Sequence, residues 1–130
     1  MASIVKEIRV PASPDRVWQQ VRDFGQVHKL FPGIVSECKM DGEARVVKFS
    51  NGIVVREILV DISDERRRLV YASVGGRATH HNASIRVFAD GAGSRVVWTL
   101  DFLPNELAPA IKGLVDAGGT VMKSAFATTA

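Results

Sequence analysis

The sequence has little cysteine and no long apolar run, and these absences exclude several classes of protein. Cys38 is the one cysteine among 130 residues, so no disulfide can form within the chain and no cysteine cluster can hold a metal. No apolar stretch approaches the roughly 20 residues that cross a bilayer as a helix, so we expect no membrane span. The N-terminus lacks the basic and then apolar regions of a signal peptide. We therefore expect a cytoplasmic protein.

An excess of charge of one sign is also missing. Lysine and arginine number 17 against 14 acidic residues, which gives a net charge of +3 at pH 7. The longest basic run, residues 66–68, directly follows Asp64 and Glu65 in a predicted turn, which is typical of a solvated charge cluster. We therefore expect no nucleic-acid partner. The hydrophobic content of 46% is ordinary for a globular protein, and we predict one domain, residues 1–130, that exists as a monomer or homodimer.

A long amphipathic helix at the end of the chain is the main feature that is present. Apolar residues and glycines recur at steps of three and four between residues 105 and 126, the spacing of one helix face. The stripe consists of Leu107, Ile111, Leu114, Val115, Gly118, Val121, Met122 and Ala125. Pro104 ends the preceding segment, and Asn105 is predicted to cap the helix by accepting from backbone N–H groups of the first turn.

Two adjacent glycines, Gly118 and Gly119, interrupt this stripe. A glycine inside a helix costs about 1 kcal/mol relative to alanine, and it removes side-chain volume where a buried helix is expected to fill it. Two interpretations stay open: a plain core helix, or a helix that closes one side of a cavity. Under the second, Gly118→Leu is expected to fill the cavity and to weaken ligand binding more than it harms folding.

The rest of the chain reads mostly as strands separated by turn signals. Two short helices, at 14–21 and 24–31, follow the first strand, and the first begins after Ser13 with a proline at the first helical position. The dipeptides Asp41-Gly42 and Asn51-Gly52 mark tight turns of a meander. The predicted strands span residues 3–10, 34–40, 44–49, 53–61, 69–74, 80–89 and 95–103. We therefore predict an α+β fold in which a curved, seven-stranded antiparallel sheet wraps around the C-terminal helix and holds a cavity.

Short motifs spread over nearly the whole chain carry a family resemblance. They are Val17-Trp18, Asp23-Phe24-Gly25, Phe31-Pro32-Gly33, residues 55–59, residues 64–67, Gly75-Gly76 and Trp98. In this pattern the chain resembles the START/birch-pollen-allergen-like (SRPBCC) superfamily, and within it the polyketide cyclase/dehydrase branch that also contains the plant abscisic-acid receptors. The resemblance implies a START-like ligand-binding domain with a helix-grip fold and an apolar pocket. It implies no single reaction, because this fold hosts binders, carriers and enzymes alike.

The resemblance also implies which residues line the pocket. Glu57 resembles the acidic residue in the receptors' pocket, and two loops occupy the places of those that close over the ligand. These gating loops contain Asn51 and Gly52, and Gly75, Gly76 and Arg77. The remaining wall is expected to consist of Val55, Leu59, Tyr71, His81, Ala83, Ile85, Trp98, Ile111, Leu114, Val115, Gly118 and Met122.

The chain departs from the hormone receptors at three places. Residues 34–38 contain no lysine where the receptors hold the hormone's carboxylate, and the gating loop at 50–53 lacks its proline. Residues 77–81 also differ from the receptors' His-Arg-Leu latch. We therefore do not expect hormone sensing.

Glu57 is the first candidate for a chemical role. Apolar neighbours on both parities of its strand leave two orientations open: inward into the pocket, or outward in a cross-strand pair with an arginine such as Arg45 or Arg68. An inward carboxylate would serve as a general base or as a ligand anchor. In that case Glu57→Gln is expected to alter affinity or turnover while the fold persists.

His81 is the second candidate. Alternation along residues 80–89 places His81 on the same face as Ala83 and Ile85, and His80 on the other face. Adjacent histidines on a strand diverge, so we expect no metal site. His81 is expected either to donate to a polar ligand group or to make a structural hydrogen bond.

Three functions stay open on this sequence. The first is binding of a small hydrophobic or aromatic ligand in a cavity between sheet and C-terminal helix, without a cofactor. The second is a cyclase- or dehydratase-type enzyme acting on a polyketide-like or aromatic substrate, with Glu57 or His81 as general base. The third is a lipid carrier or a protein-interaction module. The sequence contains no nucleophile–base pair, metal-ligand spacing or phosphate-binding loop, which weighs against the enzyme, although proton transfer needs only one positioned base.

Overall fold

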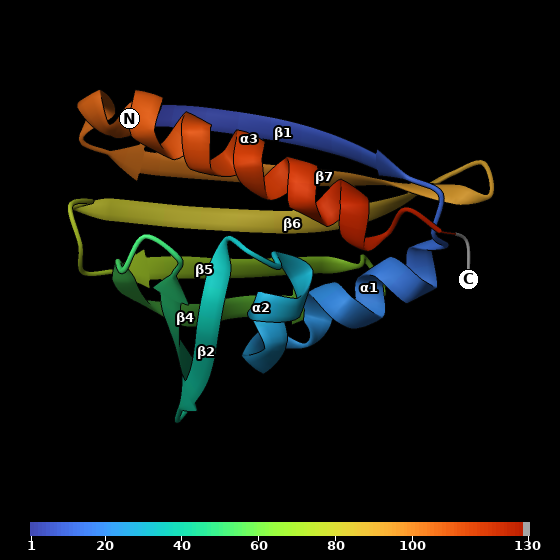
Figure 1. Cartoon of the computed structure of the whole chain (residues 1–130), viewed down its shortest axis with the longest axis horizontal. Coiled ribbons are helices and arrows are strands. Elements are labelled where there is room, and N and C mark those ends of the chain that lie inside the picture. The colour runs from blue at the N-terminus through green and yellow to red at the C-terminus, as the bar shows by residue number, and fades with distance from the viewer. Residues whose placement is uncertain (129–130) are drawn as a thin grey trace.

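The computed structural model describes residues 1–128 and shows a curved antiparallel sheet crossed by a long helix (Figure 1). Within these residues the sheet has seven strands in the order β1-β7-β6-β5-β4-β3-β2, and every neighbouring pair is antiparallel. The strands are β1 (Ala2–Val10), β2 (Val35–Asp41), β3 (Ala44–Phe49), β4 (Val54–Ser63), β5 (Arg68–Val74), β6 (His80–Asp90) and β7 (Gly93–Leu103). The helical segments are α1 (Pro14–Arg22), the 3₁₀ turn η1 (Phe24–Gln26), α2 (Val27–Leu30), the 3₁₀ turn η2 (Asn105–Leu107) and α3 (Ala108–Ala125). The predicted α+β helix-grip architecture is confirmed.

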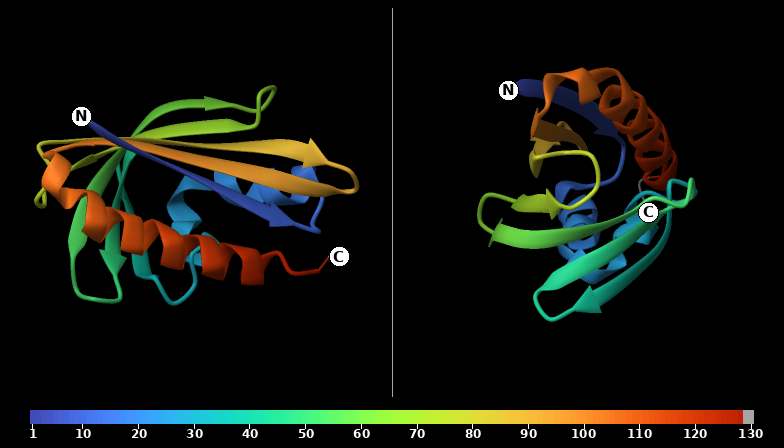
Figure 2. Two further views of the ribbon diagram at one scale, coloured as in Figure 1. Left: turned by 90° about the horizontal axis from the view of Figure 1, so that it is seen from above. Right: turned by 90° about the vertical axis from the view of Figure 1, so that its left-hand side faces the viewer.

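The sheet curls into a trough, and α3 lies along its open side (Figure 2). Register shifts between Val35 and Glu37 in β2 and between Leu59 and Asp61 in β4 mark β-bulges, which increase the bend of a sheet. One end of the trough is filled by the short helices, because α1 packs against β5, β6 and β7 while α2 packs against β2. The short helices therefore leave the other end to be covered by α3.

Ser13 sets the start of α1 as the sequence predicts. Its Oγ accepts from the Arg16 backbone N at 3.2 Å, and the next residue is a proline at the first helical position. Further along the helix, Trp18 Nε1 and Arg22 Nε each donate to Asp64 Oδ1 at 2.8 Å. These bonds fix α1 to the turn between β4 and β5.

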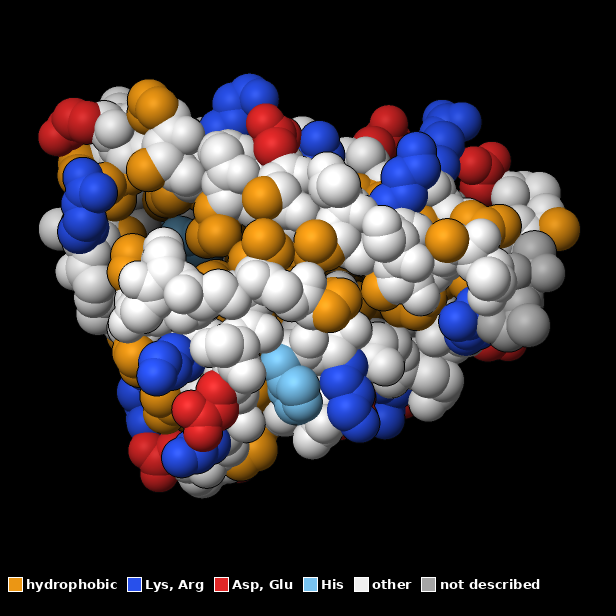
Figure 3. Space-filling model, viewed as in Figure 1, with side chains coloured by type: hydrophobic (Ala, Val, Ile, Leu, Met, Phe, Trp, Pro, Cys, Tyr) orange, Lys and Arg blue, Asp and Glu red, His pale blue; other side chains and the backbone are white. Residues whose placement is uncertain are grey.

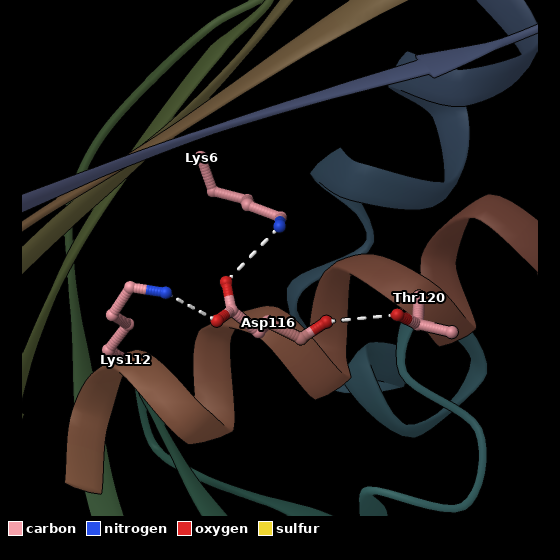
Figure 4. A network of polar contacts seen from close by, with 4 residues as sticks. All are labelled: Lys6, Lys112, Asp116 and Thr120. Atoms are coloured by element: carbon pink, nitrogen blue, oxygen red, sulfur yellow. Dashed lines mark hydrogen bonds and ion pairs between the residues drawn. The ribbon is translucent and has the colours of Figure 1, made fainter. Parts of the chain in front are cut away.

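A polar network fixes α3 to the edge strand β1 (Figure 4). Lys6 lies on the inner face of β1, and its Nζ lies 3.2 Å from Asp116 Oδ1, while Lys112 Nζ donates to Asp116 Oδ2 at 2.7 Å. Thr120 Oγ1 donates to the Asp116 carbonyl oxygen at 3.1 Å. A Cβ at Gly119 would lie 2.9 Å from Lys6 Cε. This glycine therefore allows the aliphatic part of Lys6 to cross the helix.

Asn105 does not cap the C-terminal helix, and this prediction is wrong. Asn105 opens η2, in which the Leu107 backbone N donates to the Pro104 carbonyl oxygen at 3.2 Å. α3 begins at Ala108, its N-cap is Leu107, and no side chain caps it. Pro109 lies in the first turn, where a missing N–H needs no partner, so the α-helix proper begins later than the sequence predicted.

The second predicted helix, at 24–31, is split into two pieces. η1 and α2 meet at Gln26, whose φ of −120° and ψ of 30° are not helical. The chain therefore turns once between Phe24 and Val27 and places both side chains in the core. Among the helices of residues 1–128, none is long and apolar enough to cross a membrane.

Candidate ligand-binding site

A cavity of about 390 Å³ lies between the concave face of the sheet and the N-terminal half of α3. Its surface is mostly apolar, and the molecule is visibly hollowed between α3 and the loops, with hydrophobic side chains around the hollow (Figure 3). The apolar lining consists of Val27, Phe31, Ile34, Val35, Val47, Phe49, Ile53, Val55, Ala78, Leu100, Leu107, Ile111 and Leu114. This volume lies within the range of roughly 300–1,000 Å³ that is usual for small-molecule sites.

Arg45 and Glu57 form a buried ion pair in the wall, where the register of β3 and β4 sets them opposite each other. Arg45 Nε and Nη2 each lie 2.8 Å from Glu57 Oε1, and Nη1 donates to the Phe24 carbonyl oxygen at 3.0 Å. The guanidinium lies over the rings of Phe24 and Tyr71, 4.0 and 4.9 Å from their centroids, which favours a cation. Ser73 Oγ donates to Glu57 Oε2 at 3.0 Å. The side chains of the pair are 3% and 9% exposed, so the two charges neutralise each other inside the wall.

This geometry combines the two orientations that the sequence left open for Glu57. The carboxylate faces the cavity, and it is also paired with Arg45 across the strands. Two N–H groups of Arg45 and the Ser73 hydroxyl take three of the roughly four lone-pair positions of this carboxylate, so most of its hydrogen-bonding capacity is already used. Glu57 is therefore better placed to hold Arg45 than to act as a general base.

Tyr71, Trp98 and His81 supply further polar atoms to the wall. Trp98 Nε1 donates to the Tyr71 hydroxyl oxygen at 3.2 Å. Burial raises the pKa of Tyr71 far above its ordinary value, with the charge of Glu57 adding to the shift, so this hydroxyl stays protonated. Burial also lowers the pKa of His81 below its ordinary 6.5, with the charge of Glu57 opposing, so the imidazole is neutral at pH 7. His81 Nδ1 is buried and has no hydrogen-bond partner within the described chain.

Gly118 lines the cavity, but it does not supply the empty space that the sequence suggested. A Cβ at this position would lie 3.0 Å from Trp98 Cζ3 and 3.4 Å from Phe31 Cδ1. The two rings are stacked at a tilt, with centroids 5.0 Å apart. Gly118 therefore allows α3 to approach the indole closely, and Trp98 and Phe31 form part of the cavity wall.

Two loops and α3 frame the opening of the cavity. Ile53, in the β3–β4 loop, is 52% exposed, and Leu114 on α3 is 37% exposed. Asn51 Oδ1 accepts from the Ile53 backbone N at 3.0 Å, which shapes the first loop. In the β5–β6 loop, residues 75 and 76 adopt φ values of 87° and 71°, which glycine tolerates best. Arg77 follows them, is exposed, and makes no ion pair with another residue of the range 1–128.

Comparison with protein families shows the family to which the chain belongs. The model of the family described as polyketide cyclase / dehydrase and lipid transport matches residues 1–129. The chain belongs to this family. The resemblance that the short motifs carried is therefore confirmed. No curated protein matches the sequence.

Solved structures show how widely the fold of this polyketide cyclase/dehydrase family member occurs. The protein XoxI from Bacillus cereus is 23% identical, with a TM-score of 0.88 over 97% of this chain and 96% of that one. A protein from Thermobifida fusca is 28% identical, with a TM-score of 0.80 over 97% and 91%. Norcoclaurine synthase from Thalictrum flavum is 19% identical, with a TM-score of 0.74 over 95% and 84%. Identities this low establish a common fold and leave the ligand open.

Most of the binding residues predicted for this family member lie in the cavity wall. They are Val55, Glu57, Tyr71, His81, Trp98, Ile111, Leu114 and Gly118, with Asn51, Gly75, Gly76 and Arg77 from the predicted gating loops. Six predicted residues lie outside the wall: Leu59, Ala83, Ile85, Val115, Met122 and Gly52.

Two physical reasons explain why these six residues do not line the cavity. Ala83, Ile85, Val115 and Met122 are at most 1% exposed and belong to the solid core, because the cavity occupies only part of the inner face that strand alternation identifies. Leu59 packs against the same core, and Gly52 lies exposed at the tip of its turn. Alternation gives the face of a strand, but it does not say how far a cavity extends along that face.

Arg45 and Ser73 are polar wall residues that the sequence analysis did not assign to the site. A two-residue Asn51-Gly52 turn would pair Ser50 with Ile53 and set Arg45 opposite Ile58. In the structure Phe49 and Ile53 pair across a loop of three residues, which sets Arg45 opposite Glu57. The β-bulge in β4 shows no sequence signal either, so the register that joins Glu57 to Arg45 and to Ser73 needed the structure.

Proposed function

We propose that this protein binds a small hydrophobic or aromatic molecule in the cavity and acts as a single ligand-binding domain. The observation that carries the proposal is an apolar cavity of about 390 Å³ with a few polar groups converging on it. Such a combination is the usual form of a small-molecule site. The family description, which names polyketide cyclases, dehydrases and lipid transport, also supports a role in handling apolar molecules.

Binding of this kind draws its free energy mainly from burial of the ligand. Each ligand CH₂ group that leaves water for the cavity contributes about 0.8 kcal/mol. Exposed Ile53 and Leu114 at the opening offer an apolar path from the surface to the interior. The wall polar groups then select among ligands of similar size.

A cyclase- or dehydratase-type enzyme is the second candidate, and His81 favours it. A neutral imidazole in the wall of an apolar cavity meets the requirements of a general base, and because Nδ1 is buried, Nε2 is the nitrogen left for a ligand. The enzyme proposal requires turnover of a bound aromatic or polyketide-like molecule that is lost in His81→Phe. Binding without turnover supports the carrier.

The binding proposal is tested with prodan, an uncharged naphthalene dye whose emission shifts to the blue in apolar surroundings. Val55 and Val54 are adjacent on β4 and face opposite sides, since Val55 lines the cavity and Val54 is 52% exposed. We expect saturable binding by the natural protein and by Val54→Trp. Val55→Trp is expected to weaken binding at least about tenfold, because the indole occupies the cavity.

Thermal unfolding of the two tryptophan variants checks that both are folded. Equal prodan affinity of two folded variants would contradict binding in this cavity. Absence of saturable binding by the natural protein would contradict the proposed function itself.

A further inference from the structure

The charges of the cavity wall balance each other, and this indicates which kind of ligand the cavity prefers. The inference rests on the proposed function. The titratable side chains in the wall are those of Arg45, Glu57, Tyr71, Arg77 and His81. Arg45 and Glu57 form a pair with N–O distances of 2.8 Å, so neither presents a free charge. Arg77 lies at the opening and is exposed to water. The interior beyond the opening therefore carries no net charge.

An ionic ligand group would have no counter-charge in this interior. A carboxylate placed there would lie beside Glu57 as well as Arg45, and an ammonium beside Arg45 as well as Glu57. Either ion would lose its hydration without gaining a partner, which strongly disfavours it. An uncharged ligand avoids this loss.

Two side chains of the wall, Tyr71 on β5 and His81 on the neighbouring β6, can still form hydrogen bonds with a ligand. The Tyr71 hydroxyl accepts from Trp98, and no described residue accepts the hydrogen of Tyr71 in turn. On the next strand His81 lines the cavity, and because its Nδ1 is buried, Nε2 is the nitrogen left for a ligand. In the sheet register Tyr71 is opposite Ala83, which places His81 two residues further along the same inner face. Burial keeps both groups neutral, since it raises the pKa of Tyr71 and lowers the pKa of His81.

Buried polar groups gain from a ligand that completes their hydrogen bonds. Tyr71 offers a hydrogen, and a neutral imidazole nitrogen accepts one, so the complementary ligand group both accepts and donates. A hydroxyl does this, whereas a ketone or ether only accepts. The cavity volume of about 390 Å³ lies in the range of small-molecule sites and accommodates a molecule of one or two rings.

We propose that the preferred ligand is an uncharged aromatic alcohol or phenol of one or two rings, whose hydroxyl group accepts from Tyr71 and donates to His81. Its rings lie against Trp98, Phe31 and the aliphatic wall. The Arg45–Glu57 pair supports the wall and is not the anchor of the ligand.

Four naphthalenes of similar size test the proposal by equilibrium dialysis at pH 7. They are 2-naphthol, 2-methoxynaphthalene, naphthalene and 2-naphthoate. We expect 2-naphthol to bind about tenfold more tightly than 2-methoxynaphthalene, the difference that one net hydrogen bond makes. 2-Naphthoate is expected to bind at least about tenfold more weakly than 2-naphthol, because its charge is not compensated.

Two histidine variants provide a matched pair. His81→Phe is expected to reduce the affinity for 2-naphthol to that for 2-methoxynaphthalene and to leave 2-methoxynaphthalene unchanged. His80→Phe, at the exposed neighbouring position, is expected to retain the preference. A preference for 2-naphthol that survives in His81→Phe would overturn the assignment of the hydroxyl site.

Two other results would also overturn the proposal. Equal binding of the three uncharged probes would show that the cavity binds apolar molecules without recognising a hydroxyl, and the proposed function would stand. Tighter binding of 2-naphthoate, lost in Arg77→Gln, would place an anion site at the opening instead. Failure of all four probes to bind would contradict the proposed function along with this inference.

Discussion

Arg45 and Glu57 are the residues at which burial and charge conflict most directly. Each is almost fully buried, and each is tolerated there because the other neutralises it. Sequence reasoning expected Glu57→Gln to alter binding and to leave the fold intact. The pairing changes that expectation, because the variant leaves the Arg45 guanidinium buried without a counter-charge.

Glu57→Gln is therefore expected to lower the free energy of unfolding by about 3–5 kcal/mol, the usual effect of removing one partner from a buried ion pair. Urea denaturation at pH 7 measures this loss. The double variant Arg45→Met, Glu57→Leu is the control, since replacing a whole buried pair by apolar residues is often close to neutral. A loss below about 1 kcal/mol in Glu57→Gln would show that water or a ligand reaches Arg45.

Gly118 leads to a second prediction at the residue scale. Gly118→Leu is expected to lower stability by about 1–3 kcal/mol or more, because even its Cβ would lie 3.0 Å from Trp98 Cζ3. Gly113 is the matched control on the same helix: a Cβ there meets no atom within 4 Å, so Gly113→Leu is expected to gain up to about 1 kcal/mol in helix propensity. Thermal unfolding and tryptophan fluorescence measure both variants. Equal stability of the two would mean that the indole moves aside freely.

At the scale of elements, Asp116 adds a partly exposed polar contact between α3 and β1. Hydrogen bonds from Lys112 and Lys6 lower the pKa of the Asp116 carboxyl below its ordinary 3.8. A carboxyl with a lowered pKa in the folded state adds stability above pH 3.8, and that stability is lost as the pH falls through the folded value. Acidification below pH 3.8 should therefore remove the contribution of this network to stability.

Asp116→Asn is expected to lower the melting temperature at pH 7 and to reduce the loss of stability between pH 7 and pH 3. Differential scanning calorimetry at the two pH values checks this. Glu106→Gln, at an exposed position of η2, provides the comparison for loss of one carboxylate. Identical pH dependence of Asp116→Asn and the natural protein would exclude a role for this network in acid stability.

Local signals were sufficient to predict most elements. The Asn51-Gly52 turn and the Ser13 cap act over a few residues, and the strands and α1 lie within about two residues of their predicted bounds. The position of the cavity depends instead on where α3 crosses the sheet. Ala83 and Leu100 are opposite each other in the register and share a face, yet only Leu100 lines the cavity. No local pattern distinguishes these two residues, so the extent of the site could not be predicted.

The whole molecule has a packed end and a hollow end. At the packed end Val17 and Val21 of α1 belong to one core cluster with Val87 and Val96, which are opposite each other in β6 and β7, and all four are at most 2% exposed. At the other end α3 covers a cavity of about 390 Å³. Substitutions at the exposed rim of the cavity, such as Ile53 and Leu114, should therefore alter binding more than folding, whereas wall residues such as Val47 and Leu100 also belong to the buried core.

α3 extends over both the hollow end and the packed end, and its two halves should differ in their dynamics. The first half of α3 has no side-chain cap and places Ile111 and Leu114 over the cavity, whereas the second half buries Gly118 and Met122 against the sheet. Amide hydrogens of residues 110–114 are expected to exchange with deuterium on the order of tenfold faster than those of 118–122. Uniform exchange along α3 would contradict this.

Fraying of that first half offers a route into the protein that leaves the core intact. A bound ligand adds contacts beneath Ile111 and Leu114, so 2-naphthol should slow exchange at 110–114 and leave 118–122 unchanged. The rate at which a ligand enters would then follow the local opening of two helical turns rather than global unfolding. Substitutions that strengthen only these turns, such as Gly113→Ala, should slow both entry and release.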